Sequence, residues 1–458
     1  MKLNLFVIFL HVSTLVHAQD KSTGRVVDGQ TGDPIEFVTI YNSSSENHAH
    51  TDVNGIFILK DVYVEDSILI SMVGYKRVQF IVNSKTDWDI ELEAAPIELN
   101  QVVIMPDINA ISRISDVQLK LNPVNSSQEI LRKVPGLYIS QHAGGGKAEQ
   151  IFLRGFDIDH GTDIQITTDG IPVNMVSHAH GQGYADLHFL IPETVEGIDF
   201  GKGPYYAQKG NFTTAGYVDF KTKDRVDGNS MKLEGGSFNT FRMVSMIDLF
   251  SEADNSDGYL ATEYLMTDGP FDSSQNFNRL NIFGKYATQI NNNFLKVQLS
   301  NFQSKWDASG QIPLRAVEQI GRFGSIDDTE GGQTSRQNFL IDYTVTLSES
   351  EFVNTKAYMS NYDFELYSNF TFFLEDPING DQVRQKESRK IYGLQSSYNF
   401  NTSMFLGDFV VESGAGFRFD DIDGNELSHT RNRRETLLPI ALADIDEFNG
   451  FLFSDFTW

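Results

Sequence analysis

Hydrophobic and polar residues alternate along the second half of the chain. In NFLKVQLSN (residues 293–301) every second residue from Leu295 to Leu299 is apolar, and the residues between them are polar. The same period of two recurs in RLNIFGKYA, NFLIDYTVTL, KIYGLQSSYNF and FVVESGAGFRF. Segments of about ten residues with this period are typical of membrane β-barrels. A large soluble β-sandwich gives the same alternation with its apolar side inward, so both architectures stay open at this point.

About ten strands of this kind fit between residues 226 and 458. The final stretch, GFLFSDFTW, reads as the middle of a strand. A barrel of about ten strands is too narrow to enclose a further domain. We therefore expect residues 226–458 to form the first part of an antiparallel transmembrane β-barrel, with the remaining strands missing from this sequence.

The first half of the chain has a different pattern. Residues 22–93 predict a small β-sandwich, because short runs of β-branched and aromatic residues alternate with Gly, Asn and Asp turns. In SSQEILRKVPGLYI a helix is predicted to start at Ser126 or Ser127 and to stop at Pro135. Short strands follow it, so residues 112–225 predict a mixed α/β unit.

The N-terminus carries a targeting segment. Lys2 provides a positive charge, residues 3–16 are apolar, and Val16-His17-Ala18 fits a cleavage site. A signal peptide of residues 1–18 is predicted, with an N-terminal membrane anchor as the alternative. Elsewhere no stretch reaches the roughly 18 apolar residues of a membrane-spanning helix.

The composition of the chain excludes some classes of partner and of cross-link. The formal net charge of −26 argues against nucleic acid as a partner, because phosphate binding requires basic surface. The chain has no cysteine, so disulfides are excluded. Any zinc site would have to be built from histidines and carboxylates.

One segment gathers possible metal ligands. NMVSHAHGQGYADLHFLIPE contains His178, His180, Asp186 and His188, and imidazole suits zinc, copper, nickel and iron. We consider these four residues a possible ligand or metal contact. The alternative is a structural loop whose histidines form hydrogen bonds. A secreted metal-dependent hydrolase with Glu193 as its base is a third hypothesis.

The chain as a whole resembles a TonB-dependent outer-membrane receptor that carries an N-terminal carboxypeptidase regulatory-like domain. The motifs that carry the resemblance to the accessory domain are Gly24-Arg25-Val26, Asp33-Pro34-Ile35, Thr51-Asp52, Gly55-Ile56-Phe57 and Gly74-Tyr75. The motifs that resemble the receptor are ELNQVVIMP, ILRKVPGLYI, FLRGFD, ITTDGIPVN and GKGPYYAQKGNFTTAGYVDFKTK, in that order.

This resemblance implies a domain order. Residues 19–95 would be the accessory sandwich, 96–110 a linker with the TonB box, 111–225 the plug and 226–458 the partial barrel. The box would be Gln101, Val102, Val103 and Ile104, and a plain linker strand is the alternative for this run. Arg154 and Asp169 would belong to plug structure buried against the barrel wall.

The resemblance also implies a function. Such receptors sit in the cell outer membrane and import a scarce nutrient, such as an iron-siderophore, haem, cobalamin or metal chelate. The implied partners are periplasmic TonB, a small-molecule or metal-chelate ligand and outer-membrane lipid. No enzymatic activity and no cofactor are expected. A glycan-type importer and a non-transport exported β protein with an adhesive or structural role remain alternatives.

Overall fold

The computed structural model describes most of the chain after the predicted signal peptide. The described residues are 21–29, 31–45, 47–72, 75–83, 88–93, 113–115, 124, 126–141, 145–158, 161–181, 183–249, 256–348, 350–404 and 407–458. The predicted signal peptide and the predicted TonB box lie outside them. The chain divides into two compact units, residues 1–101 and 102–458.

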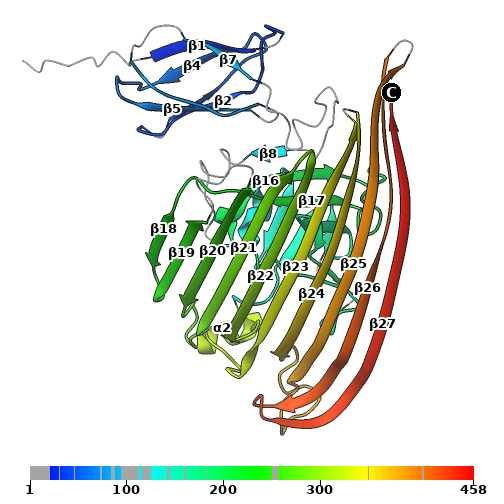
Figure 1. The fold of residues 1–458 in the computed structure, drawn as a ribbon. Coiled ribbons are helices and arrows are strands. Elements are labelled where there is room, and N and C mark those ends of the chain that lie inside the picture. The colour runs from blue at the N-terminus through cyan, green and yellow to red at the C-terminus, as the bar shows by residue number, and fades with distance from the viewer. Residues whose placement is uncertain are drawn as a thin grey trace, which may run out of the picture. The chain divides into compact units, whose positions relative to one another are not determined.

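The first unit contains two packed β-sheets (Figure 1). One has the order β4-β1-β7 and the other β3-β2-β5-β6. The strands are β1 (Lys21–Asp28), β2 (Thr39–Asn42), β3 (His48–His50), β4 (Ile56–Lys60), β5 (Ser67–Ser71), β6 (Val78–Ile81) and β7 (Trp88–Leu92). Alternate residues such as Phe57 and Leu59 are buried and pack against Val26, Ile40 and Ile68. This confirms the predicted sandwich, whose core forms where one face of each strand is apolar.

A partly buried tyrosine hydrogen bond makes the stability of this sandwich depend on pH. The hydroxyl of Tyr75 donates to Asp28 Oδ2 at 2.7 Å. Burial and this bond raise the pKa of Tyr75 to about 12, against about 10 in an unfolded chain. The bond's contribution is therefore fully present below about pH 10 and is lost as pH rises through about 12. We expect the melting temperature to fall less over this window in Tyr75→Phe than in the wild type, measured by circular dichroism. An equal fall in both proteins would contradict the role given to Tyr75.

The second unit begins with an inner domain. Its five-stranded sheet has the order β13-β12-β17-β16-β8, and its smaller sheets have the orders β11-β10-β9 and β14-β15. The elements are β8 (Arg113–Ser115), η2 (Gln128–Lys133), β9 (Leu137–Ser140), β10 (Gln150–Leu153), β11 (Phe156–Ile158), β12 (Ile164–Thr168), β13 (Ile171–Pro172), β14 (Asn174–Val176), β15 (Gly183–Ala185), η3 (Pro192–Thr194), β16 (Val195–Lys202) and β17 (Gly216–Thr222). β8 is an edge strand that pairs with β16 over three residues.

The predicted helix near Ser127 is a 3-10 helix of six residues rather than an α-helix. It ends where predicted, because Pro135 follows and Gly136 adopts a positive φ of 82°. Its buried residues Ile130 and Leu131 join the core of the inner domain together with Ile166, Ile198 and Phe220.

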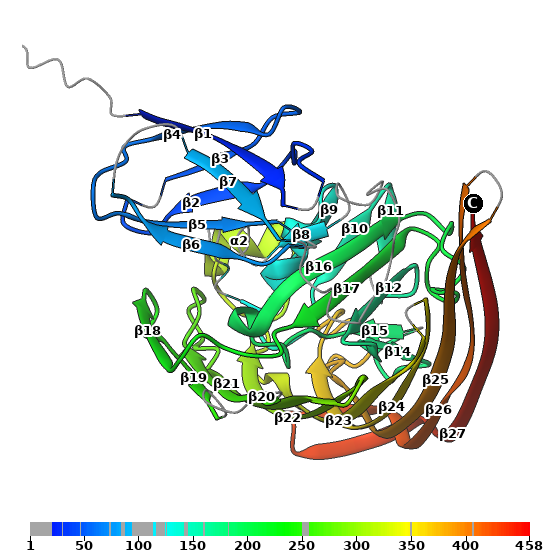
Figure 2. The same cartoon turned by 45° about the horizontal axis from the view of Figure 1, so that its top comes forward.

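Ten antiparallel strands form one sheet after the inner domain, in sequence order from β18 to β27. They are β18 (Ser230–Gly236), β19 (Thr240–Asp248), β20 (Ser256–Thr267), β21 (Phe277–Ile290), β22 (Asn293–Ala308), β23 (Glu330–Ser348), β24 (Glu351–Ser368), β25 (Val383–Met404), β26 (Gly407–Arg431) and β27 (Glu435–Thr457). Figure 2 shows the sheet curving along the inner domain. The predicted antiparallel sheet of about ten barrel-type strands is confirmed.

The long connections of this sheet lie at one end. Residues 309–329, which contain α2 (Leu314–Ile320), and residues 369–382 both connect strands at the end that Figure 1 shows lowest. The turn at Asn291 and Asn292, at the opposite end, is short. None of the helices within the described ranges is long and apolar enough to cross a membrane.

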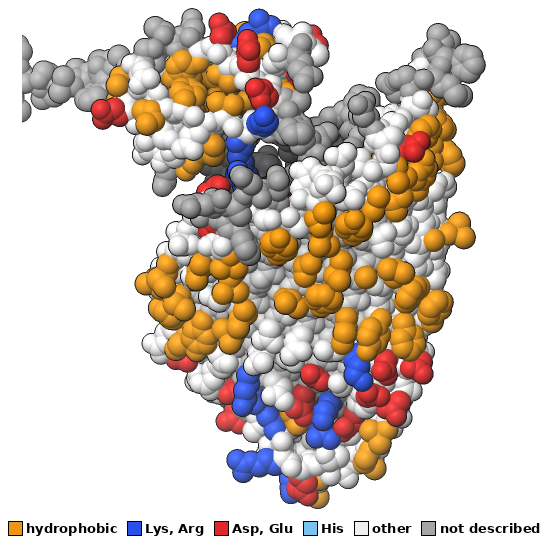
Figure 3. Space-filling view, in the orientation of Figure 1, with side chains coloured by type: hydrophobic (Ala, Val, Ile, Leu, Met, Phe, Trp, Pro, Cys, Tyr) orange, Lys and Arg blue, Asp and Glu red, His pale blue; other side chains and the backbone are white. Residues whose placement is uncertain are grey.

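The two faces of the sheet have opposite character. The apolar residues of the alternating pattern are exposed on the outer face, where they form the band seen in Figure 3. They include Leu280, Ile282, Leu299, Phe339, Ile341, Leu394 and Phe417. The polar residues between them, such as Arg279, Asn281 and Gln298, are buried toward the inner domain. This orientation is the reverse of a soluble sandwich, whose apolar side faces inward.

Candidate functional site

The candidate site is the interface where the inner domain meets the polar face of the ten-stranded sheet. Among the polar contacts that cross this interface are three groups, one near Glu193, one near Asp169 and one near His178. Each joins a loop or turn of the inner domain to side chains that project inward from neighbouring strands. Alternation places these side chains there, because every second residue of a strand points to the same face.

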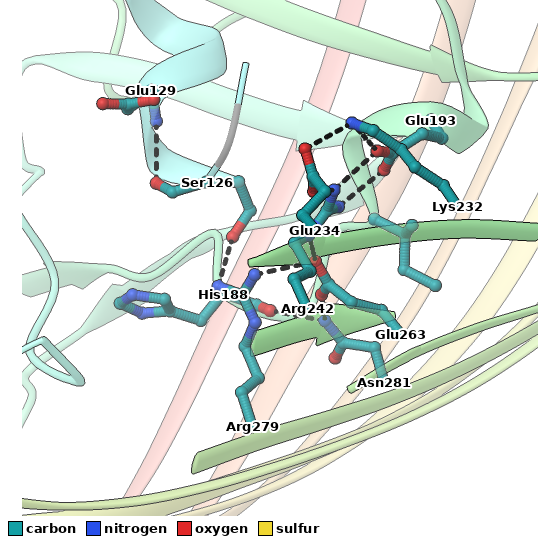
Figure 4. A network of polar contacts seen from close by, with 12 residues as sticks. Ser126, Glu129, His188, Glu193, Lys232, Glu234, Arg242, Glu263, Arg279 and Asn281 are labelled. Atoms are coloured by element: carbon teal, nitrogen blue, oxygen red, sulfur yellow. Dashed lines mark hydrogen bonds and ion pairs between the residues drawn. The ribbon is translucent and has the colours of Figure 1, made fainter. Parts of the chain in front are cut away.

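The first group centres on Arg242 of β19 and Glu193 of η3 (Figure 4). Both oxygens of Glu193 accept hydrogen bonds from the Arg242 guanidinium, at 2.6 and 2.7 Å. Arg242 Nε also donates to Glu263 Oε1 at 2.7 Å. Glu263 accepts further bonds from Arg279 Nη2 at 2.9 Å and Asn281 Nδ2 at 2.8 Å. A planar two-pronged contact of this kind fixes orientation as well as distance.

The same group reaches other parts of the inner domain. Asn281 Nδ2 donates to the backbone oxygen of His188 at 2.9 Å, and Arg279 Nη1 donates to Ser127 Oγ at 3.1 Å. Burial alone would raise the pKa of Glu193, but the hydrogen bonds and charge of Arg242 outweigh it and hold that pKa below its ordinary value. Glu193 is therefore an ionised partner of Arg242, and its carboxylate oxygens are occupied.

The second group surrounds the turn at Asp169 and Gly170. Both residues have positive φ, 52° and 95°, so the chain makes a tight turn here. Asp169 accepts hydrogen bonds from the backbone nitrogen and hydroxyl of Thr222, at 3.0 and 2.6 Å. Lys285 of β21 donates to the Thr222 carbonyl at 3.0 Å. Asp169 is thus buried against the sheet, as expected.

Asp224 follows β17 and pairs with two lysines of the sheet. Lys285 Nζ lies 2.8 Å from Asp224 Oδ1, and Lys296 also contacts this carboxylate. Burial alone would raise the pKa of Asp224, but the two ammonium groups lower it overall. Asp224 therefore remains ionised at neutral pH, and its contacts fasten the end of the inner domain to β21 and β22.

Arg154 corrects one sequence expectation. It was expected to be buried against the barrel wall, but it lies exposed in the turn between β10 and β11, with a φ of 54°. The turn requires positive φ at Arg154 and at Gly155. The Arg-Gly pair therefore serves the geometry of this hairpin, away from the polar face of the sheet.

The third group involves the loop with His178 and His180. His178 Nε2 lies 3.1 Å from the hydroxyl of Tyr362, and the His178 ring stacks on Tyr184 with ring centres 4.4 Å apart. The backbone nitrogen of Ala179 donates to Glu387 Oε2 at 2.8 Å. His180 Nδ1 lies 2.9 Å from Gln385 Oε1. The loop is therefore held by β24 and β25 of the sheet.

His188 and Asp186 form a separate pair. His188 Nδ1 lies 2.7 Å from Asp186 Oδ1, and both side chains are buried. Within the described parts of the chain, no three His, Asp or Glu side chains gather closely enough to hold a metal ion. The possible metal contact by His178, His180, Asp186 and His188 stays a prediction.

Arg279, Asn281 and Lys285 lie in the alternating segment RLNIFGKYA, but the alternation alone assigns them no role. Nor does it single out Arg242, Glu263 or the buried Trp306. A charged residue inside an alternating strand could have pointed to these contacts, because burying a charge costs free energy unless the charge is paired.

Comparisons with known proteins cover both units. The family model described as the TonB-dependent receptor plug domain matches residues 107–217, and the model described as a CarboxypepD_reg-like domain matches residues 22–104. A TonB-dependent receptor of Formosa agariphila is 25% identical over 223 residues, which are 46% of this chain and 20% of that protein. The vitamin B12 transporter of Vibrio vulnificus is 26% identical over 332 residues, which are 69% of this chain and 48% of that protein.

Solved structures share the fold. The unliganded ferric citrate transporter FecA superposes with a TM-score of 0.61 at 14% sequence identity, covering 75% of this chain and 53% of that chain. The present chain thus spans about half the length of this structure and of the Vibrio vulnificus relative, and about a fifth of the Formosa agariphila relative.

Proposed function

Because the chain is a TonB-dependent receptor with an N-terminal carboxypeptidase regulatory-like domain, we propose that it acts in the cell outer membrane to import a scarce nutrient. The observation that carries this proposal is the two-faced sheet. Its exposed apolar band suits a lipid environment, and its polar face is paired with an inner plug. The chain is not an enzyme, and the hydrolase hypothesis fails because Arg242 occupies both oxygens of its supposed base, Glu193.

The proposed cargo is an iron-siderophore, haem, cobalamin or another metal chelate. The Vibrio vulnificus relative, which is named a vitamin B12 transporter, supports this class. Ligand would enter from the end of the barrel that carries the long connections, since such barrels place their longer loops outside the cell. The loop at His178 and His180 contacts β25 only a few residues from this end, so it is the proposed ligand or metal contact.

Energy would come from periplasmic TonB. The proposed handle is Gln101, Val102, Val103 and Ile104, a β-prone run that TonB would bind by strand addition. The handle precedes β8, so a pull would reach the inner domain through its edge strand. The ionic contacts at Glu193 and Asp224 would hold the rest of the plug against the wall meanwhile.

The test is uptake by cells that carry the protein in their outer membrane. Labelled ferric siderophores, haem, cobalamin and copper chelates are offered to cells with and without TonB. We expect one ligand to accumulate only with TonB, and deletion of residues 101–104 to stop accumulation while surface binding persists. Uptake that survives the deletion would refute the handle, and failure to bind any of these ligands would refute the cargo class.

A second variant locates the ligand contact. Calorimetric titration of wild type and of His178→Ala/His180→Ala is compared with the ligand identified by uptake. Loss of binding in the variant supports a recognition role for the histidine loop. Equal binding assigns specificity to the long connections of the barrel and limits the loop to a structural role.

A further inference from the structure

A second His-x-His pair lies on the accessory sandwich, far along the sequence from the plug loop. His48 and His50 are the two ends of β3, an edge strand of the sheet β3-β2-β5-β6. Both residues are exposed, whereas Ala49 between them packs toward the core. Nothing in the proposed transport function uses this pair.

The strand brings the two imidazoles together on one face. Residues i and i+2 of a strand project to the same side. The ring centres of His48 and His50 lie 5.8 Å apart, with an angle of 71° between the ring planes. Two imidazole nitrogens that share a zinc ion each lie about 2.0–2.1 Å from it. This spacing of the rings suits two nitrogens that bind the same ion.

A neighbouring hydroxyl orients one of the rings. Thr39 of β2 faces His50 across the hairpin, and its Oγ1 lies 3.4 Å from His50 Nδ1. When Nδ1 carries the proton and donates to Thr39, Nε2 is left as the ligand atom. Metal-bound histidines commonly have such a partner on the second ring nitrogen.

We propose that His48 and His50 form a two-histidine site for a divalent transition-metal ion on the accessory domain. Copper(II) binds most tightly, followed by nickel or zinc, as expected for imidazole ligands. Water completes the coordination. The site is independent of the plug loop, where His178 and His188 are buried and hydrogen-bonded to other side chains.

The test measures copper(II) binding to the whole protein by calorimetry and by electron paramagnetic resonance. The variants are His48→Gln, His50→Gln and the double variant. A metal ion held by two imidazoles is bound about 100-fold more tightly than an ion held by one. We therefore expect either single substitution to weaken this site by about 100-fold, and the double variant to add little. The resonance spectrum should show coupling to two nitrogens in the wild type only.

Two controls keep the outcome decisive. Thr39→Val retains both ligands and should weaken binding by about 10-fold, with the two-nitrogen signal intact. His178→Ala/His180→Ala should leave the signal unchanged, whatever it does to transport. The proposal is overturned if the double His48/His50 variant binds copper as the wild type does, or if each single variant loses only half of an additive signal.

Discussion

Replacing Glu263 by glutamine lowers the free energy of unfolding of the plug–barrel unit by about 3–5 kcal/mol. The carboxylate is fully buried and accepts hydrogen bonds from Arg242, Arg279 and Asn281. Glutamine keeps the shape but removes the charge, and its amide nitrogen faces groups that can only donate. Two buried guanidinium groups then lose their shared counter-ion, which costs more than the pair itself contributes.

A matched control lies on β18, on the other side of the strand β19 that carries Arg242. Glu234 of β18 bonds the same Arg242 at 2.8 Å, but its side chain is 29% exposed. Glu234→Gln should cost less than about 1 kcal/mol, because water screens and replaces the contact. Denaturant unfolding in detergent micelles, followed by fluorescence, measures both variants. Equal losses would show that burial of Glu263 does not set the strength of this network.

Trp306→Ala is expected to have an effect of similar size. The ring is 1% exposed and packs with Met175, Tyr184 and Phe364 between the plug and the sheet. A side chain added at Gly146 would lie 2.1 Å from Trp306 Cε3, so the plug backbone itself closes over the ring. Removing the ring leaves a cavity that this backbone cannot fill, at a cost of about 3–5 kcal/mol.

Trp458→Ala provides the comparison, since that ring is 85% exposed. It should change the unfolding free energy by no more than about 0.5 kcal/mol. Trp306→Phe, which keeps an aromatic ring in place, should fall between the two. If Trp306→Ala unfolds at the same denaturant concentration as the wild type, the ring does not join the plug to the sheet.

The period-two pattern in the second half of the chain predicted which residues share a face of the sheet, in addition to where the strands lie. It separated Leu280 and Ile282 from Arg279 and Asn281, and the structure exposes the first pair and buries the second. Whether the apolar side faced lipid or a core did not follow from alternation, because both give the same period. The turn at Asp169 was predictable because its positive φ favours such a residue followed by glycine.

The pairing across the interface was beyond this reasoning. Glu193 meets Arg242, and His178 meets Tyr362 after an interval of 184 residues. Such contacts depend on how far the sheet curves and on which strand stands opposite each loop. The local sequence pattern contains no information on the curvature of the sheet or on the strand that lies opposite each loop. For the same reason it did not predict that Arg154 is exposed.

Strand β8 joins the sheet of the plug through only three residue pairs, so it is a weakly attached edge. Any tension applied to the chain before Arg113 loads the bonds between β8 and β16 first, whereas β16 pairs with β17 along its length from Val195 to Lys202. We expect the short pairing to separate before the longer one, because it contains three residue pairs against seven. If the chain before Arg113 is pulled, as we propose, the β8–β16 pairing has fewer bonds to break and to remake than the β16–β17 pairing behind it.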